Sequence, residues 1–176
     1  MPVSTENFKS FPALLRFFGV MAVGLSLDLW SKAVALAHLS GDRQVSFIPG
    51  YLQFEFLNNP GAVFGLGAGQ RTIFIAVSIL AVAFLVFLFA TSGKQKLYQV
   101  LLGMILAGVL GNLYDRIVYG QVRDMIHIFP RWPHLYPWVF NVADSMLCVG
   151  VFMMLVYSFI HDHKPAQPSA ADAASH

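Results

Sequence analysis

Two aspartates near the last apolar segment have the residue type and the spacing for acid–base chemistry. Asp144 lies in the sequence FNVADS (residues 140–145), at the head of an apolar run that carries no charged residue up to Ile160. A carboxylate costs about 2.5–3.5 kcal/mol at the centre of a membrane span and less near its end, so it is usually retained for function and paired inside a helix bundle. The nearest candidate partner is Asp124, in the sequence VRDMI (residues 122–126).

A pair of carboxylates in a poorly solvated site has a specific chemical use. Both cannot ionise at low cost, so one stays protonated while the other acts as a base. Such a pair can activate a water molecule and protonate a leaving amine, which is peptide hydrolysis without a metal or a covalent intermediate. Intramembrane acids also serve as proton relays, so a proton-coupled transporter is an alternative, and a non-catalytic membrane scaffold is another. The residues alone leave the three open.

Other chemistries have weaker support in the sequence. No HExxH motif is present, and His127 and His134 lack the spacing of metal ligands, so we predict neither a metal nor a cofactor. Ser145 has no obvious base as a partner. The single cysteine, Cys148, excludes an internal disulfide, and a thiol buried in a membrane is hard to ionise. We therefore predict that Cys148 is a small apolar core residue.

The composition indicates an integral membrane protein with one domain. Hydrophobic residues make up 57% of the 176-residue chain and charged residues only 11%, against about 25% charged residues in a soluble domain. The mean hydropathy of +0.63 supports the same conclusion. A formal net charge of +2 argues against nucleic acid as a partner.

Four apolar segments are long enough to cross a hydrocarbon core of about 30 Å. Together they define one membrane domain over residues 13–160, between disordered ends at 1–12 and 161–176. We predict the spans at about 17–39, 72–91, 97–116 and 139–160.

Two segments between the spans have a different character. Alternating residues in 51–57, followed by a turn at 58–61, predict a small β-sheet within residues 43–70, on the membrane surface. A short return strand or loop follows at 62–65. We predict an interfacial loop with aromatic residues at 120–137.

The polar residues of the spans gather at one depth. An even number of spans puts both termini on one side, and basic residues near the span ends identify that side as the cytoplasm: Lys9, Arg16, Lys94, Lys96 and Lys164. Asp28 and Lys32 share a helix face and predict an ion pair. Small residues at four-residue spacing, Gly103, Ala107 and Gly111, predict close helix packing on the face that continues to Asp115. With this topology, the polar clusters converge on the outer leaflet.

Five motifs in order resemble the lipoprotein signal peptidase family, signal peptidase II, from about residue 17 to 157. They are Asp28-x-x-x-Lys32, NPGAVFG (59–65), GNLYDR (111–116), VRDMI (122–126) and FNVADS (140–145). Arg123 and Met125 look like permitted variation beside Asp124. Pro60 departs from the family pattern and stiffens its loop while leaving Asn59 and Gly61 in place.

The resemblance implies an all-α membrane fold: a bundle of four transmembrane helices, a small extracytoplasmic β-sheet and a periplasmic loop over the active site. It implies an aspartic endopeptidase of the bacterial inner membrane that acts near the outer, periplasmic leaflet, with both termini cytoplasmic. The substrates would be prolipoproteins that carry a diacylglyceryl group, cleaved just before the lipidated cysteine. We expect a monomer that contacts membrane lipid and needs no cofactor.

The resemblance also implies roles for individual residues. Asp124 and Asp144 would be the catalytic pair. Substrate-binding or supporting residues would be Asn59, Gly61, Asn112, Arg116, Asn141 and Ala143. Structural support would come from Asp28, Lys32 and Asp115.

Overall fold

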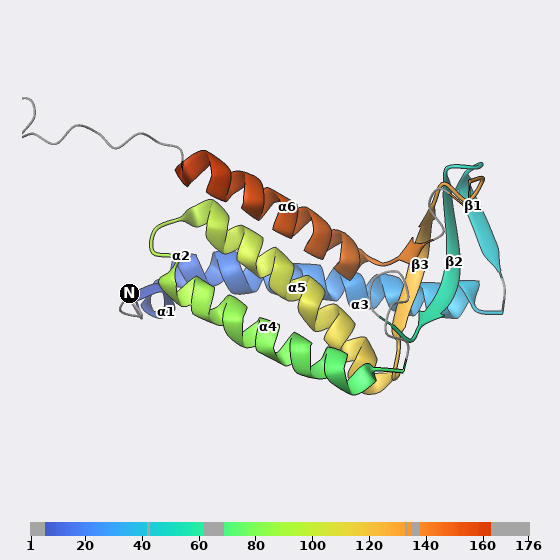
Figure 1. Cartoon of the computed structure of the whole chain (residues 1–176), viewed down its shortest axis with the longest axis horizontal. Coiled ribbons are helices and arrows are strands. Elements are labelled where there is room, and N and C mark those ends of the chain that lie inside the picture. Colours follow the sequence, from blue (N-terminus) through green and yellow to red (C-terminus); the bar gives the residue numbers. More distant parts are fainter. Residues whose placement is uncertain (1–5, 42, 62–68, 133, 135–137, 163–176) are drawn as a thin grey trace, which may run out of the picture.

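Four long helices form a bundle in the computed structural model, which describes residues 6–41, 43–61, 69–132, 134 and 138–162 (Figure 1). The stretches long and apolar enough to cross a membrane are Phe11–Leu39, Arg71–Thr91, Lys96–Val118 and Val142–Ile160. The first contains α2 (Phe11–Leu14), a π-helical turn (η1, Leu15–Gly19) and α3 (Val20–Leu39); the others are α4 (Arg71–Thr91), α5 (Lys96–Val118) and α6 (Val142–Asp162). The prediction of a four-span helical bundle is confirmed.

Helix α5 occupies the centre of the bundle and packs against α3, α4 and α6. Its small residues allow this close packing. A Cβ atom at Gly103 would meet the carbonyl oxygen of Phe17, and one at Gly108 would meet the carbonyl oxygen of Ala143 at 2.6 Å. A Cβ atom at Gly111 would meet the carboxylate of Asp28. The predicted small-residue face therefore packs against η1 at Gly103 and against α3 at Gly111, and the neighbouring Gly108 packs against α6.

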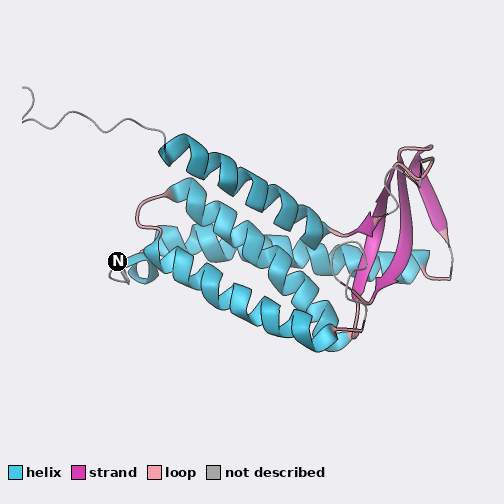
Figure 2. Ribbon diagram, in the orientation of Figure 1, coloured by secondary structure: helices cyan, strands magenta, loops and turns pink. Residues whose placement is uncertain are grey.

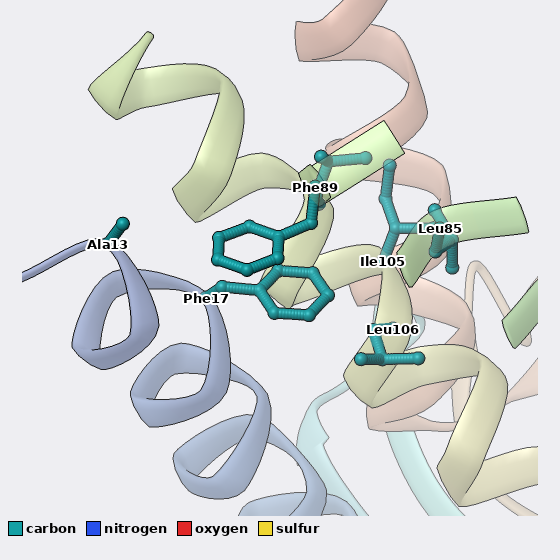
Figure 3. Packing of buried hydrophobic residues seen from close by; sticks show 7 residues of the cluster. Ala13, Phe17, Leu85, Phe89, Ile105 and Leu106 are labelled. Carbon is teal, nitrogen blue, oxygen red and sulfur yellow. The ribbon is translucent and has the colours of Figure 1, made fainter. Parts of the chain in front are cut away.

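The apolar core lies at the end of the bundle where the N-terminal helices meet α4 and α5. Phe17 of η1 and Phe89 of α4 are completely buried, with their rings stacked at 4.3 Å between centroids (Figure 3). Leu102, Ile105 and Leu106 of α5 belong to the same cluster. This core holds one end of the bundle together and leaves the other end for polar residues.

The N-terminal segment differs from the prediction of disorder over residues 1–12. Helix α1 (Glu6–Lys9) precedes α2, so residues 6–12 are largely helical; residues 1–5 lie outside the described part of the chain. The Asn7 side chain is buried and donates hydrogen bonds to the carbonyl oxygen of Phe89 at 2.8 Å and to Ser92 Oγ at 3.1 Å. These bonds satisfy polar groups at the C-terminal end of α4. They join residues far apart in the sequence, so the local composition of residues 1–12 does not predict them.

A four-stranded antiparallel sheet extends beyond the other end of the bundle (Figure 2). Its strands are β1 (Gln44–Ile48), β2 (Leu52–Asn59), β3 (Val122–Ile128) and β4 (Val139–Phe140), in the order β1-β2-β3-β4. The predicted small sheet is confirmed, with β1 and β2 within the segment expected for it. The return segment predicted at 62–65 lies outside the described residues.

Two boundaries predicted from the sequence are wrong. The segment 120–137 is not only a loop, because it contains β3, the strand that carries Asp124. The fourth span does not begin at residue 139, because Val139 and Phe140 form β4 and α6 begins at Val142. Strand β3 lacks a polar–apolar alternation because its first four residues, Val122 to Met125, are all buried.

We expect Gly111→Ala to lower the thermal stability of the protein in detergent, because the added methyl group would displace the Asp28 carboxylate. Overpacking of this kind costs about 1–3 kcal/mol. Gly19→Ala is a matched control, since its Cβ would have Leu15 Cδ1 as its nearest contact, at an ordinary 3.5 Å. Both substitutions replace a helical glycine with alanine, so equal melting temperatures for the two variants would contradict the close contact at Gly111.

Candidate active site

Asp124 and Asp144, here called the carboxylate pair, come from two elements that meet where the sheet joins the bundle. Asp124 lies in β3 opposite Leu57 of β2, and Asp144 lies in the first turn of α6. Asn141 precedes α6 and forms a reciprocal cap with Asp144. The Asp144 backbone N–H donates to Asn141 Oδ1 at 2.9 Å, and the Asn141 backbone N–H donates to Asp144 Oδ2 at 3.2 Å. This pattern fixes the Asp144 carboxylate at the helix N-terminus, where a negative charge is favoured.

Asn141 also joins the two carboxylates. Its completely buried side chain donates from Nδ2 to Asp124 Oδ1 at 2.6 Å, while its backbone holds Asp144. Each carboxylate accepts a second amide donor from another element. Asn59 Nδ2 donates to Asp124 Oδ2 at 3.0 Å, and Asn112 Nδ2 donates to Asp144 Oδ1 at 2.7 Å. The three asparagines that the resemblance implied therefore all contact the carboxylate pair.

The two carboxylates differ in their exposure. Asp124 is 1% exposed, whereas Asp144 is half-buried and lines a cavity of about 510 Å³. The cavity lies between α4, α5, α6 and the ends of β2, β3 and β4, and its wall is mainly apolar. Cys148 lines this cavity and is exposed, so its prediction as a core residue is wrong. It lies one turn beyond Asp144, on a face of α6 that the neighbouring helices leave uncovered.

Burial raises the pKa of Asp124 from 3.8 to about 7, and the negative charge of Asp144 contributes to this increase. Hydrogen bonds from Asn59 and Asn141 and the positive charge of Lys32 lower the pKa of Asp124 and offset part of the increase. A carboxyl group with a pKa near neutrality can hold a proton and release it during a reaction at physiological pH. Acid–base chemistry by two carboxylates requires them to differ. Here Asp124 is buried and can hold a proton near neutral pH, whereas Asp144 lines the cavity.

Arg116 connects the loop after β2 to the cavity. Its Nη2 donates to the carbonyl oxygen of Gly61 at 3.1 Å, and its guanidinium lies 5.0 Å from the centre of the Phe74 ring. The Gly61 backbone N–H donates to Asn59 Oδ1 at 2.9 Å, which is the geometry of an Asx turn. Asn59, Gly61 and Arg116 thus form one connected unit, and the Asx turn lies within the turn predicted at 58–61.

Beneath the carboxylate pair lies a group of four charged side chains, here called the buried ion cluster: Asp28, Lys32, Asp115 and Arg123. Lys32 Nζ lies 2.8 Å from Asp28 Oδ2 and 3.2 Å from Asp115 Oδ2. It also donates to Asn112 Oδ1 at 3.1 Å. The predicted ion pair of Asp28 and Lys32 is present, and it extends to the asparagine that contacts Asp144.

The same cluster holds the beginning of α6. Asp28 Oδ1 accepts the backbone N–H of Ala143 at 2.8 Å, and the Ala143 side chain is completely buried. Arg123 completes the cluster through a pair with Asp115 at 2.7 Å. Arg123 is thus part of the cluster, although it looks like permitted variation in the sequence; a basic residue directly beside Asp124 is the signal for this role.

His127 and His134 lie away from this site. His127 is in β3 and pairs with Glu55 of β2 at 2.8 Å, while His134 is exposed. Among the described residues, no three His, Cys, Asp or Glu side chains are placed to share a metal ion.

The raised pKa of Asp124 predicts a pH-dependent difference in stability between wild type and Asp124→Asn. In the unfolded chain the carboxyl ionises near pH 3.8, but in the folded protein it stays protonated to about pH 7. The wild type therefore loses stability as the pH rises through this window and keeps the penalty above it. We expect Asp124→Asn to melt above wild type at pH 8, with a smaller difference at pH 4. Melting curves at several pH values measure this difference, and a pH-independent gap would contradict the predicted titration.

Comparisons with known proteins identify the family. The family model described as signal peptidase (SPase) II matches residues 20–160. A lipoprotein signal peptidase of Enterococcus faecalis is 35% identical over 156 residues, covering 88% of this chain and 93% of the relative. A lipoprotein signal peptidase of Rhodopirellula baltica is 37% identical over 186 aligned positions, covering 93% of this chain and 81% of the relative.

The fold is similar to that of a solved bacterial membrane enzyme. The two structures align with a TM-score of 0.74 at 26% sequence identity, over 84% of this chain and 91% of that one. The transporter alternative has no support among these relatives. The sequence, the four-span bundle and the relatives together assign the chain to the signal peptidase II family of membrane peptidases.

Proposed function

We propose that this protein is an aspartic endopeptidase that cleaves prolipoproteins just before a cysteine carrying a diacylglyceryl group. The observation that carries this proposal is the carboxylate pair joined by Asn141, with one member lining a largely apolar cavity. The names of the relatives supply the class of substrate. The cavity is formed by segments long enough to cross the membrane, so lipid chains can remain in the bilayer while the peptide bond reaches the site.

The two carboxylates have different tasks in the proposed reaction. Asp144, which lines the cavity, takes a proton from water as the water oxygen attacks the carbonyl carbon of the scissile bond. Asp124 holds a proton up to about pH 7 and supplies it as the carbon–nitrogen bond breaks. The amine then leaves in neutral form, and the proton taken up by Asp144 restores the pair. Asn59, Asn112 and Asn141 orient the two carboxylates, and Arg116 and Gly61 contact the substrate chain.

The proposal includes a position in the cell. The site lies near the outer, periplasmic leaflet of the bacterial inner membrane, with both termini in the cytoplasm and the sheet on the outer surface. The protein acts as a monomer. Asp28, Lys32 and Asp115 support the site from beneath.

The decisive experiment incubates the purified full chain with a lipobox peptide whose cysteine carries a diacylglyceryl group. The expected result is cleavage at the bond before this cysteine, with little cleavage of the same peptide without the lipid. A metal chelator serves as a control and should leave the rate unchanged. Equal cleavage of both peptides would contradict the proposed substrate class, and absence of cleavage would contradict the activity itself.

A further inference from the structure

Arg123, the residue directly before Asp124, is held on α5 by both its backbone and its side chain. Its backbone N–H donates to Asp115 Oδ2 at 3.0 Å. Its guanidinium donates to Asp115 Oδ1 from Nη2 at 2.7 Å and from Nε at 3.2 Å, and it lies 4.1 Å from the centre of the Tyr119 ring. Paired donors of this kind fix the orientation of the guanidinium as well as its position.

The charges of the buried ion cluster balance. Asp28 and Asp115 contribute two negative charges, and Lys32 and Arg123 contribute two positive charges. All four side chains are at most 4% exposed. Water screens such charges weakly, so the loss of one leaves an uncompensated field in the surrounding protein.

We propose that Arg123 is a positioning residue for peptide cleavage: its pair with Asp115 anchors the strand segment that carries Asp124, and its charge keeps the buried ion cluster neutral. This inference rests on the proposed function. The position of Asp124 is restrained at two points. Asn59 and Asn141 hold its carboxylate, and the contact of the Arg123 backbone with Asp115 fixes the strand one residue earlier. A loose strand would change the separation of the carboxylate pair.

The charge of Arg123 also has a consequence for the pH dependence of cleavage. The charged groups that act on Asp124 are Asp144 from α6, Lys32 from α3 and Arg116 from α5. Lys32 lies between Asp28 and Asp115, and Arg123 supplies the second positive charge that balances these two carboxylates. Without Arg123 the cluster carries one net negative charge, which makes ionisation of the carboxylate pair more costly. The bell-shaped pH profile of kcat/KM then moves to higher pH.

The test compares pH profiles of kcat/KM for the diacylated lipobox peptide. For Arg123→Met we expect a shift of roughly one pH unit upward, the size that one unit charge produces at about 10 Å with an effective dielectric constant of about 20. We also expect kcat to fall by roughly 10- to 100-fold, since a displacement of about 1 Å can cost on the order of 10²-fold. Arg123→Lys keeps the charge and should keep the wild-type profile, with a reduced kcat because the paired donors are lost.

A double variant separates charge from anchoring. Arg123→Met combined with Asp115→Asn removes one charge of each sign, so we expect the pH profile to return to the wild-type position while kcat stays low. Arg131→Met is the matched control, because Arg131 is exposed and its guanidinium contacts Trp132. This control should leave both the profile and kcat unchanged. A purely structural role for Arg123 would lower the amount of folded enzyme without moving any pH profile.

The outcomes distinguish this inference from the proposed function. If wild type cleaves the peptide and all Arg123 variants share its pH profile, the inference is wrong and the function stands. If wild type does not cleave, the function is wrong, and infrared titration of the Asp124 carboxyl band still measures the effect of the charge. If Arg123→Met unfolds, the double variant decides: a profile displaced to higher pH would overturn the neutral-cluster argument, and a profile at the wild-type position supports it.

Discussion

Asp124→Asn and Asp144→Asn should each abolish cleavage of a diacylated lipobox peptide while leaving the protein folded. Neither carboxylate of the proposed pair can replace the other, since one must accept a proton from water and the other must supply one. General acid–base groups contribute about 10²–10⁴-fold to a rate, so each substitution should lower kcat by at least this range. The amide side chain has nearly the same shape, and the contacts around both residues come from several elements, so the fold should persist.

A control for this prediction is Glu55→Gln, which neutralises a carboxylate on the sheet. Glu55 pairs with His127 and accepts hydrogen bonds from Gln44 and Gln53, so the same chemical change occurs away from the carboxylate pair. We expect Glu55→Gln to cleave at the wild-type rate. Cleavage is followed by mass spectrometry of the peptide products, and folding by a melting curve of each variant. Turnover close to wild type in either Asp124→Asn or Asp144→Asn would show that the carboxylate pair is wrongly assigned.

Residues of the site could be predicted because placing a carboxylate in a membrane span is costly in free energy, so such residues stand out in the sequence. A carboxylate at the head of an apolar span is usually functional, and this rule identifies Asp144 from the sequence alone. Small residues spaced every four positions likewise predict the packed face of α5, which the contacts of Gly103 and Gly111 confirm. Both inferences depend on periodicity within one helix, the signal that a single sequence carries best.

The parts that could not be predicted depend on contacts between distant segments. Strand β3 has no polar–apolar alternation, because Arg123 and Asp124 are both buried and take their partners from α5, from β2 and from Asn141, which precedes α6. The exposure of Cys148 depends on which face of α6 the other helices leave open. The N-terminal helices pack because Asn7 finds partners on α4, more than 80 residues away. The local composition of each segment does not predict such contacts.

Lys32→Met should cause the largest loss of stability among the variants considered. Lys32 pairs with both Asp28 and Asp115, and all three side chains are completely buried. Removal of the lysine charge leaves Asp28 without a cation, since Arg123 pairs with Asp115. Breaking a buried ion pair from one side costs about 3–5 kcal/mol, because the remaining charge is uncompensated. The melting temperature in detergent measures this loss.

The double variant Asp28→Asn with Lys32→Met should recover part of that stability, because the remaining Asp115 and Arg123 charges balance. Asparagine at position 28 still offers an oxygen to the Ala143 N–H and fits against Gly111, which a larger leucine would not. Cleavage should stay impaired, since Lys32 also orients Asn112 toward Asp144. A double variant no more stable than Lys32→Met would refute the ion-pair account. Full recovery of the cleavage rate would instead mean that Asn112 keeps its orientation without the lysine.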